Sequence, residues 1–154
     1  MRNSIFRFKY KNRREYAEFY GQEISRYLGK EIKQLKPDVL VPVPLYKTKL
    51  QRRGFNQAEI LANEIGKNLD IPVKKNLIIR TENTRPQKEL NHIERENNLK
   101  KAFKIHQNDV KLNTVVLVDD IYTTGSTVDA IAKILKAQGI QKIYYVTLAS
   151  GSGK

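Results

Sequence analysis

Apolar side chains recur at spacings of three and four residues between Glu15 and Pro37, which is the pattern of one face of an α-helix. The stripe consists of Ala17, Tyr20, Ile24, Tyr27, Leu28, Ile32 and Leu35. Proline disfavours helical backbone in the residue before it, so the helix should end before Pro37. The pattern predicts a helix that packs on a core through this stripe.

The residues ahead of this helix alternate between apolar and basic side chains from Ile5 to Lys11. A period of two is typical of a strand at the edge of a sheet. The same residues could form a basic arm whose aromatic rings stack on nucleobases. We favour the strand, and expect residues 1–37 to be a basic N-terminal arm and an amphipathic helix packed on the core.

Four further apolar runs have the composition of β-strands. Val115 to Val118 contains only β-branched and aliphatic residues, which is typical of a strand buried on both faces. The other three runs are Asp38–Pro44, Leu77–Arg80 and Lys142–Leu148. Prolines occur only at the end of such a strand, so the first run should stop at its two prolines.

Two helical patterns lie between these runs. Asn56 is placed to cap the first helix, and Ser126 or Thr127 the second. Gly139 should end the second helix in a Schellman motif. The residues expected to face inward are Ala58, Leu61, Ala62, Ile65 and Leu69 in the first helix, and Val128, Ile131, Ala132 and Leu135 in the second.

Strands and helices alternate from Asp38 onward, which predicts an α/β fold with a mostly parallel sheet flanked by helices and right-handed crossovers. We expect one domain over residues 38–149, because 154 residues suit a single core. Residues 150–154 combine Ser, Gly and Lys and should form a flexible tail.

Composition narrows the function classes. The chain has no cysteine, so disulfides and thiolate metal sites are excluded, and its two histidines, His92 and His106, cannot form a zinc site by themselves. Any metal should be a hard cation bound to oxygen. The sequence contains no apolar run long enough to span a bilayer, so we expect a cytoplasmic protein without membrane insertion.

The formal net charge is +13, and two segments carry most of it. Residues 1–36 hold ten Lys and Arg against four Glu, and residues 74–104 hold nine against four. Ordinary solubility charge mixes both signs and gives a smaller net value in a domain of this size. The distribution therefore favours a polyanionic partner.

The main candidate site begins where the buried strand ends. Asp119 and Asp120 are followed by a small hydroxyl-rich loop and a helix N-terminus, where free backbone N–H groups and the helix dipole favour an anion. Two carboxylates repel phosphate but suit sugar hydroxyls, or a Mg²⁺ ion that bridges to a phosphate. The candidate sugar-phosphate site comprises Asp119, Asp120, Thr123, Thr124, Gly125, Ser126 and Thr127.

Two other segments are expected to lie near this site. Leu45 to Phe55 should be a basic loop whose cations include Lys47, Lys49, Arg52 and Arg53. It follows a strand, as the acidic pair does, and ligands of open α/β sheets bind beyond the carboxyl ends of the strands. Thr81 to Asn98 is polar throughout and should be a mobile loop, with helix expected near Glu89 to Leu99. A lid that closes over a ligand and plain disorder in the free protein both fit this composition, and the two are compatible. Its candidate residues are Thr84, Arg85, Gln87, Lys88 and Arg95.

The order of residues from Val118 to Thr127 resembles the phosphoribosyl-pyrophosphate (PRPP) signature of type I phosphoribosyltransferases. More of the chain resembles the ComF family, whose members are phosphoribosyltransferase-like proteins associated with natural competence. The matching segments are Pro42–Leu45, Arg53–Gln57, the Arg80–Asn98 pattern with Thr84, Gln87, Leu90 and Arg95, and Val118–Thr127. ComF proteins commonly begin with a four-cysteine zinc ribbon, and zinc binding is not carried over to a chain without cysteine.

This resemblance implies a type I phosphoribosyltransferase fold that binds PRPP and Mg²⁺ at Asp119 to Thr127, with Asp119 and Asp120 as direct or water-mediated metal ligands. It places Arg52 and Arg53 near the pyrophosphate. It also implies a role in importing single-stranded DNA together with a helicase-like ComF partner.

Three functions remain open from the sequence. The first is DNA uptake, with PRPP as a bound ligand and single-stranded DNA as partner, which we favour. The second is catalysis, in which a nucleophile attacks C1 of the ribose and pyrophosphate leaves, as in nucleotide metabolism. No residue identifies the acceptor. The third is a nucleic-acid-binding regulator that responds to PRPP.

Overall fold

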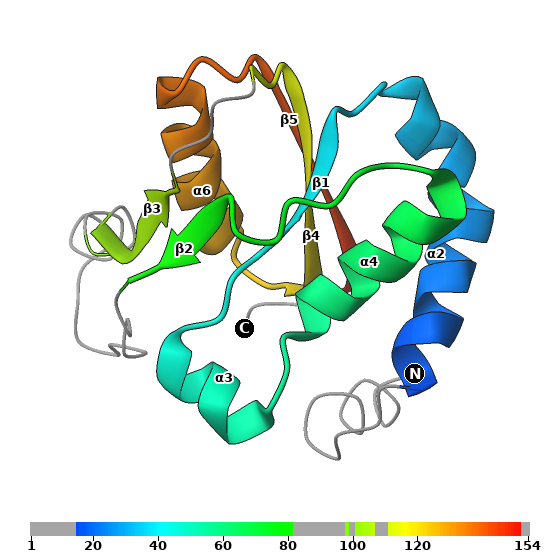
Figure 1. Cartoon of the computed structure of the whole chain (residues 1–154), viewed down its shortest axis with the longest axis horizontal. Coiled ribbons are helices and arrows are strands. Elements are labelled where there is room, and N and C mark those ends of the chain that lie inside the picture. Colours follow the sequence, from blue (N-terminus) through cyan, green and yellow to red (C-terminus); the bar gives the residue numbers. More distant parts are fainter. Residues whose placement is uncertain (1–14, 82–97, 99–100, 107–110, 152–154) are drawn as a thin grey trace.

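The computed structural model of the chain describes residues 15–81, 98, 101–106 and 111–151. Four helices and five strands lie in these segments, and Figure 1 shows their arrangement. The helices are α2 (Glu15–Gln34), α3 (Lys47–Arg53), α4 (Gln57–Leu69) and α6 (Ser126–Ala137). The strands are β1 (Val39–Pro42), β2 (Ile78–Arg80), β3 (Phe103–Ile105), β4 (Thr114–Tyr122) and β5 (Lys142–Ser150).

The main sheet has the strand order β1-β4-β5, and both pairings are parallel. In register, Val39 lies beside Val115 and Lys142 beside Thr114. A single parallel bridge between Leu40 and Val73 continues the sheet beyond β1. Strand β4 is central, and Val115 to Val118 are at most 1% exposed, as expected for a strand covered on both faces.

Helices cover both faces of this sheet, as the alternation of elements predicts (Figure 1). One face packs Leu40, Val116 and Val118 against α2 and α4. The other face packs Val115 and Leu117 against α6 and the β2-β3 pair. The predicted α/β fold with a parallel sheet flanked by helices is confirmed.

Helix α2 approaches α4 closely at two glycines. A Cβ atom on Gly21 would lie 2.3 Å from Cβ of Glu64, and one on Gly29 would lie 2.9 Å from a methyl carbon of Leu69. The predicted inward stripe is therefore only partly right. Ala17, Tyr20, Ile24 and Ile32 are buried, whereas Tyr27 and Leu28 are 66% and 41% exposed. The close contact runs along the glycines and leaves these two side chains outside it.

Helix α6 ends as its sequence predicts. Gly139 has a φ of 89°, the N–H of Ile140 donates to the carbonyl of Leu135, and the N–H of Gly139 donates to that of Lys136. These are the two hydrogen bonds of a Schellman motif. At the start of the helix the prediction was wrong. The N-cap is Gly125, whose carbonyl accepts the N–H of Asp129, so Ser126 is already helical.

Three further features differ from the sequence analysis. Strand β3 was not predicted, because Lys104 interrupts its apolar residues and it lacks the continuous apolar run of the equally short β2; it pairs antiparallel with β2. The expected basic loop after β1 contains helix α3. Ser150, expected in the tail, ends β5, and the N–H of Gly151 donates to the carbonyl of Tyr122 at 2.7 Å.

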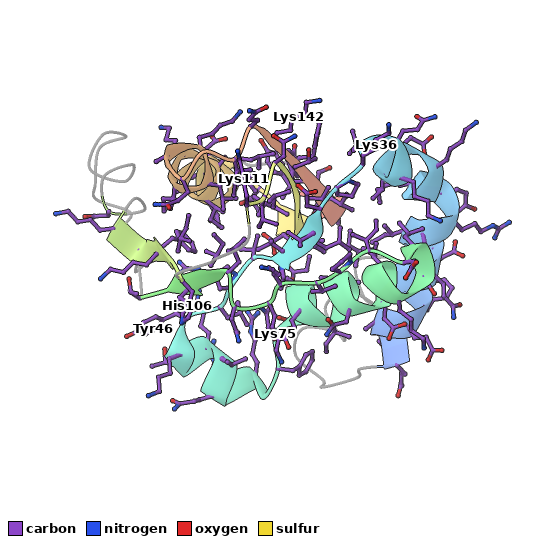
Figure 2. All side chains as sticks on the ribbon, turned by 45° about the horizontal axis from the view of Figure 1, so that its top comes forward. Lys36, Tyr46, Lys75, His106, Lys111 and Lys142 are labelled. Atoms are coloured by element: carbon purple, nitrogen blue, oxygen red, sulfur yellow. The ribbon has the colours of Figure 1, made fainter. Side chains whose placement is uncertain are left out.

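The amino ends of β1 and β4 are joined through Asp38. Its carboxylate accepts N–H groups from Asn113 at 2.7 Å and Thr114 at 2.8 Å. Both bonds stabilise the charged form of Asp38 and so hold its pKa below the ordinary value. The bond from Thr114 has the larger effect, and the bond from Asn113 the smaller. Figure 2 labels Lys36, Lys111 and Lys142 along this end of the molecule, and Tyr46, Lys75 and His106 toward the opposite end.

The glycine contact between α2 and α4 can be tested by Gly21→Ala. Alanine favours a helix by about 1 kcal/mol over glycine, but its methyl group would overlap the side chain of Glu64, and overpacking typically costs about 1–3 kcal/mol. We expect a net loss of unfolding free energy in urea titrations. Gln22→Ala, at the exposed neighbouring position, is the control and should be neutral or stabilising. A Gly21→Ala protein more stable than the wild type would contradict this packing.

Candidate functional site at the carboxyl end of the parallel sheet

Strands β1 and β4 end side by side, which brings two chain segments to one edge of the sheet. Pro42 lies beside Val118, and the N–H of Val43 donates to the carbonyl of Val118 at 2.9 Å. Helix α3 follows β1 and the loop to α6 follows β4, and both lie on this side of the sheet (Figure 1). The expectation that the basic and acidic segments share one edge follows from this register.

The acidic pair lies in the last part of β4. Asp119 and Asp120 are both half-buried, and Oδ1 of Asp119 accepts the backbone N–H of Asp120 at 2.8 Å. This bond fixes the first carboxylate against its own backbone. Asp119 also pairs with Thr147 of β5, so the sheet holds its backbone from the side of β5.

The loop after the pair turns sharply at Gly125, whose φ is 78°. A left-handed conformation is strained for other residues, and a Cβ atom here would lie 2.6 Å from the hydroxyl oxygen of Tyr122. Both constraints favour glycine. Beside it, the hydroxyls of Thr124 and Ser126 form a hydrogen bond of 2.9 Å. Thr123, Thr124 and Ser126 are exposed and Thr127 is half-buried.

The first turn of α6 can receive an anion. The N-cap residue Gly125 has no side chain, so it gives α6 no acceptor of the kind that Asn56 gives to α4. The N–H of Ser126 donates to Oγ1 of Thr124 at 3.5 Å. The leading N–H groups of α6 and the hydroxyls of Thr123, Thr124, Ser126 and Thr127 are donors on one short segment. The structure therefore brings the predicted sugar-phosphate residues together, with carboxylates at one end and donors at the other.

Helix α3 presents part of the predicted basic cluster to solvent. Lys47 and Arg52 are exposed. Arg53 is half-buried, and its Nη1 donates to Oε1 of Gln57 at 3.3 Å. Gln57 is only 1% exposed, so Arg53 has a structural bond that its sequence position did not reveal.

The Arg53–Gln57 segment fixes α3 and α4 to the end of β1. Gly54 ends α3 with a φ of 79°, and Phe55 is buried in the core. Asn56 caps α4 by accepting the N–H of Ala58 at 3.1 Å, and its Nδ2 donates to the carbonyl of Val43 at 3.0 Å. The predicted cap is confirmed. This segment sets the geometry of the edge from which the cations project.

Arg80 is a further charged residue that interacts electrostatically with Asp119, and its sequence position alone does not assign it to the site. It ends β2 and is half-buried, with its guanidinium carbon 5.3 Å from the ring centroid of Phe103. Burial lowers the pKa of Arg80, and attraction to Asp119 acts in the opposite direction. One sequence feature could have pointed to Arg80 as a site residue. It lies at the carboxyl end of a predicted strand, as Asp119 does.

Several predicted residues lie outside the described segments. They are the loop residues Thr84, Arg85, Gln87, Lys88 and Arg95, and the basic residues of the arm before Glu15. Within the described segments, no group of three His, Cys, Asp or Glu side chains could hold a metal ion. Two adjacent carboxylates fit Mg²⁺ only if the remaining coordination positions are filled by water or by oxygens of a bound substrate, which is the usual way that proteins bind this ion.

None of the described helices is long and apolar enough to cross a membrane.

Comparisons with known proteins show the family and the fold of this chain. The model of the phosphoribosyl transferase domain family matches residues 16–154. Among solved structures, a purine phosphoribosyltransferase of Pyrococcus horikoshii has a TM-score of 0.56 at 22% identity, covering 86% of this chain and 74% of that one. An adenine phosphoribosyltransferase of Leishmania tarentolae has a TM-score of 0.53 at 15% identity, with coverages of 84% and 70%. These likenesses show a type I phosphoribosyltransferase fold.

Sequence relatives are more similar than these structures. Competence protein F of Haemophilus influenzae is 37% identical, covering 94% of this chain and 66% of that protein. DNA utilization protein YhgH of Escherichia coli is 34% identical, with coverages of 88% and 60%, and competence protein ComFC of Bacillus subtilis is 31% identical, with coverages of 90% and 55%. The chain thus spans about half to two thirds of the length of these relatives. It belongs to the phosphoribosyl transferase domain family and, within it, to the ComF proteins that its motifs resemble.

Proposed function

We propose that this protein binds PRPP with Mg²⁺ at the carboxyl end of β4 and binds single-stranded DNA during DNA uptake. One observation carries the PRPP assignment. The half-buried carboxylates of Asp119 and Asp120 stand directly before a glycine turn and a helix N-terminus with several donors. Carboxylates accept hydrogen bonds from sugar hydroxyls, and the helix terminus attracts a phosphate, so the two halves match a ribose 5-phosphate.

Each part of the edge has a role in this proposal. Asp119 and Asp120 accept the ribose 2′ and 3′ hydroxyls, and the segment from Thr123 to Thr127 donates to the 5′-phosphate. Lys47 and Arg52 of α3 face solvent near this edge and attract the pyrophosphate. A Mg²⁺ ion held by carboxylate and ligand oxygens would supply positive charge against the pyrophosphate.

Single-stranded DNA is the proposed polyanionic partner. The net charge of +13 supports this choice, and relatives named for competence and DNA utilization support it independently. We further propose a helicase-like ComF partner and a cytoplasmic location, both of which fit the handling of an imported strand.

Catalysis is the second candidate, supported by the likeness of this fold to the two phosphoribosyltransferase structures. The reaction would pass through a transition state with positive charge on the ribose, so this edge would mainly stabilise the leaving pyrophosphate. If the protein is an enzyme, incubation with PRPP, Mg²⁺ and a nucleobase or DNA should release pyrophosphate above the background rate. If the wild type releases no more pyrophosphate than the Asp119→Ala, Asp120→Ala control, the site binds PRPP without catalysing its reaction.

The PRPP assignment predicts a loss of affinity in the Asp119→Ala, Asp120→Ala variant. Each substitution removes acceptors for a ribose hydroxyl, and a single hydrogen bond to a charged group contributes about 1.5–3 kcal/mol. We expect the affinity for PRPP to fall by at least about 100-fold in calorimetric titrations with Mg²⁺. Asp129→Ala, an exposed change in the first turn of α6, is the control and should not weaken binding. Equal affinity of the double variant and the wild type would exclude this site.

The nucleic-acid assignment predicts a strong dependence of affinity on salt. Lysines and arginines that contact phosphates release counterions, so the logarithm of the binding constant should fall linearly with the logarithm of the salt concentration. We expect a slope of about −0.7 for each phosphate contacted on a single strand. Fluorescence anisotropy with a labelled oligo(dT) measures it. Absence of binding at low salt would refute the DNA assignment without affecting that of PRPP.

A further inference from the structure

Three exposed lysines lie at the amino end of the parallel sheet, away from the end that carries Asp119 and Asp120. Lys36 precedes β1, Lys111 precedes β4, and Lys142 is the first residue of β5. Figure 2 labels all three along one end of the molecule. Strand β4 has nine residues, and each advances the chain by about 3.3 Å, so about 25 Å separates its amino end from the start of the loop to α6.

Backbone hydrogen bonds hold the three lysine-bearing segments together. The N–H of Asp38 donates to the carbonyl of Thr114 at 2.9 Å. The N–H groups of Gln141 and Lys142 donate to the carbonyl of Asn113 at 3.1 and 3.0 Å. Each of the three segments carries its lysine within two residues of these bonds. The lysines therefore belong to one surface, although they lie far apart in the sequence.

The charge of this surface is strongly positive. Four lysines and one acidic residue, Asp38, lie in the segments that meet here, which are residues 34–38, 111–114 and 136–142. The carboxylate of Asp38 accepts two backbone N–H groups. Within the described part of the chain, the three lysines that precede or start the strands form no ion pair. Their ammonium groups are therefore available to an external anion.

Structural roles explain only part of this cluster. Exposed lysines are common, and cations near the carboxyl end of a helix offset its dipole. Lys136, in the last turn of α6, has such a role, because its ammonium group donates to the carbonyl of Gln141. Lys111 and Lys142 lie outside the helices, directly before or in a strand. Their charges need a different explanation.

Lys36 occupies a position where the backbone favours a different residue. Its φ is 50°, which is in the left-handed region. After a helix this conformation is usually adopted by glycine, which has no Cβ atom to clash, or by asparagine. The turn after α2 therefore does not require a lysine. A residue kept in an unfavourable conformation is a reason to look for a function of its side chain.

A strand of nucleic acid fits this surface better than the opposite end of the sheet. Lysine ammonium groups bind phosphates as point charges and do not read the bases, which suits DNA of any sequence. At the carboxyl end, Asp119 and Asp120 would repel the phosphates of a strand. A strand carries a phosphate at every nucleotide, so it can contact several of these lysines at once, which a small anion cannot do.

We propose that Lys36, Lys111 and Lys142 form a contact surface for the phosphates of single-stranded DNA at the amino end of the sheet. This location rests on the nucleic-acid part of the proposed function and makes it specific. Because PRPP is assigned to the other end of β4, both ligands bind at the same time without competing.

Two matched double variants locate the strand. Lys111→Gln, Lys142→Gln removes two lysines of this surface, and Lys101→Gln, Lys104→Gln removes two exposed lysines at β3, so the two proteins have equal net charge. Each phosphate contact on a single strand contributes about 0.7 to the salt slope. In anisotropy titrations with labelled oligo(dT), the first variant should have a slope shallower by about 1.4, and the second the slope of the wild type. The reverse result would place the strand at β3 and overturn the surface.

Lys36→Gly separates the charge from the fold. Glycine adopts the left-handed conformation without a clash, so the free energy of unfolding in urea titrations should not fall. The same variant should lose one phosphate contact, which makes its salt slope shallower by about 0.7. A stable Lys36→Gly protein with the slope of the wild type would overturn the role of Lys36.

A competition experiment separates this surface from the PRPP site. Oligo(dT) should bind equally well without PRPP and with saturating PRPP, at constant Mg²⁺ and ionic strength. Displacement of the strand by PRPP would place both ligands at one end and overturn the proposal. If the wild type binds oligo(dT) and no lysine variant changes the slope, the surface is wrong and the general DNA assignment stands. If the wild type binds no strand at low salt, both are wrong.

Discussion

The whole arrangement depends on the pairing of β4 with strands on both of its sides. Because β1 and β5 run parallel to it, every connection that leaves their carboxyl ends leaves at the same edge. The hydrogen bond from the N–H of Val43 to the carbonyl of Val118 holds the ends of β1 and β4 together at this edge. It brings a segment that follows residue 42 beside one that follows residue 118. Cations and carboxylates far apart in the sequence then share one surface, with a dry core beneath them.

The sequence predicted well those elements whose pattern is long or chemically strict. The run from Val115 to Val118 has the composition of an internal strand, and Asn56 has the residue type and position of an N-cap. Elements without such a pattern were missed. The three residues of β3 alternate Phe-Lys-Ile and lack the continuous apolar run that reveals the equally short β2, and the charged residues of the seven-residue α3 hide its helix. The exposure of Tyr27 and Leu28 depends on a glycine contact with α4, a tertiary fact that no local pattern contains.

The candidate site shows a similar division. The residues from Asp119 to Thr127 lie on one continuous segment, so sequence alone could group them. Arg80 comes from another sheet, so only folding brings its charge near enough to Asp119 to affect the pKa of Arg80. The Arg53–Gln57 segment illustrates the opposite error. Its arginine was interpreted only as a ligand contact, whereas the structure gives its guanidinium a bond to the buried Gln57 and gives Asn56 a bond to the end of β1. Residues of a family motif can therefore have a structural role, in which they hold a site in position. They need not contact the ligand themselves.

The antiparallel pair of β2 and β3 has a consequence for how this fold can vary. The N–H of Thr81 donates to the carbonyl of Ala102 at 2.8 Å, so the two ends of the intervening segment are fastened to each other beside Arg80. A chain closed in this way changes its closure entropy only slowly with length, by about 0.6 kcal/mol for each doubling. Insertions or deletions between these two residues could therefore accumulate without moving β4 or the acidic pair. The pairing of β2 with β3 therefore separates the geometry of β4 and the acidic pair from the length of the segment between Thr81 and Ala102.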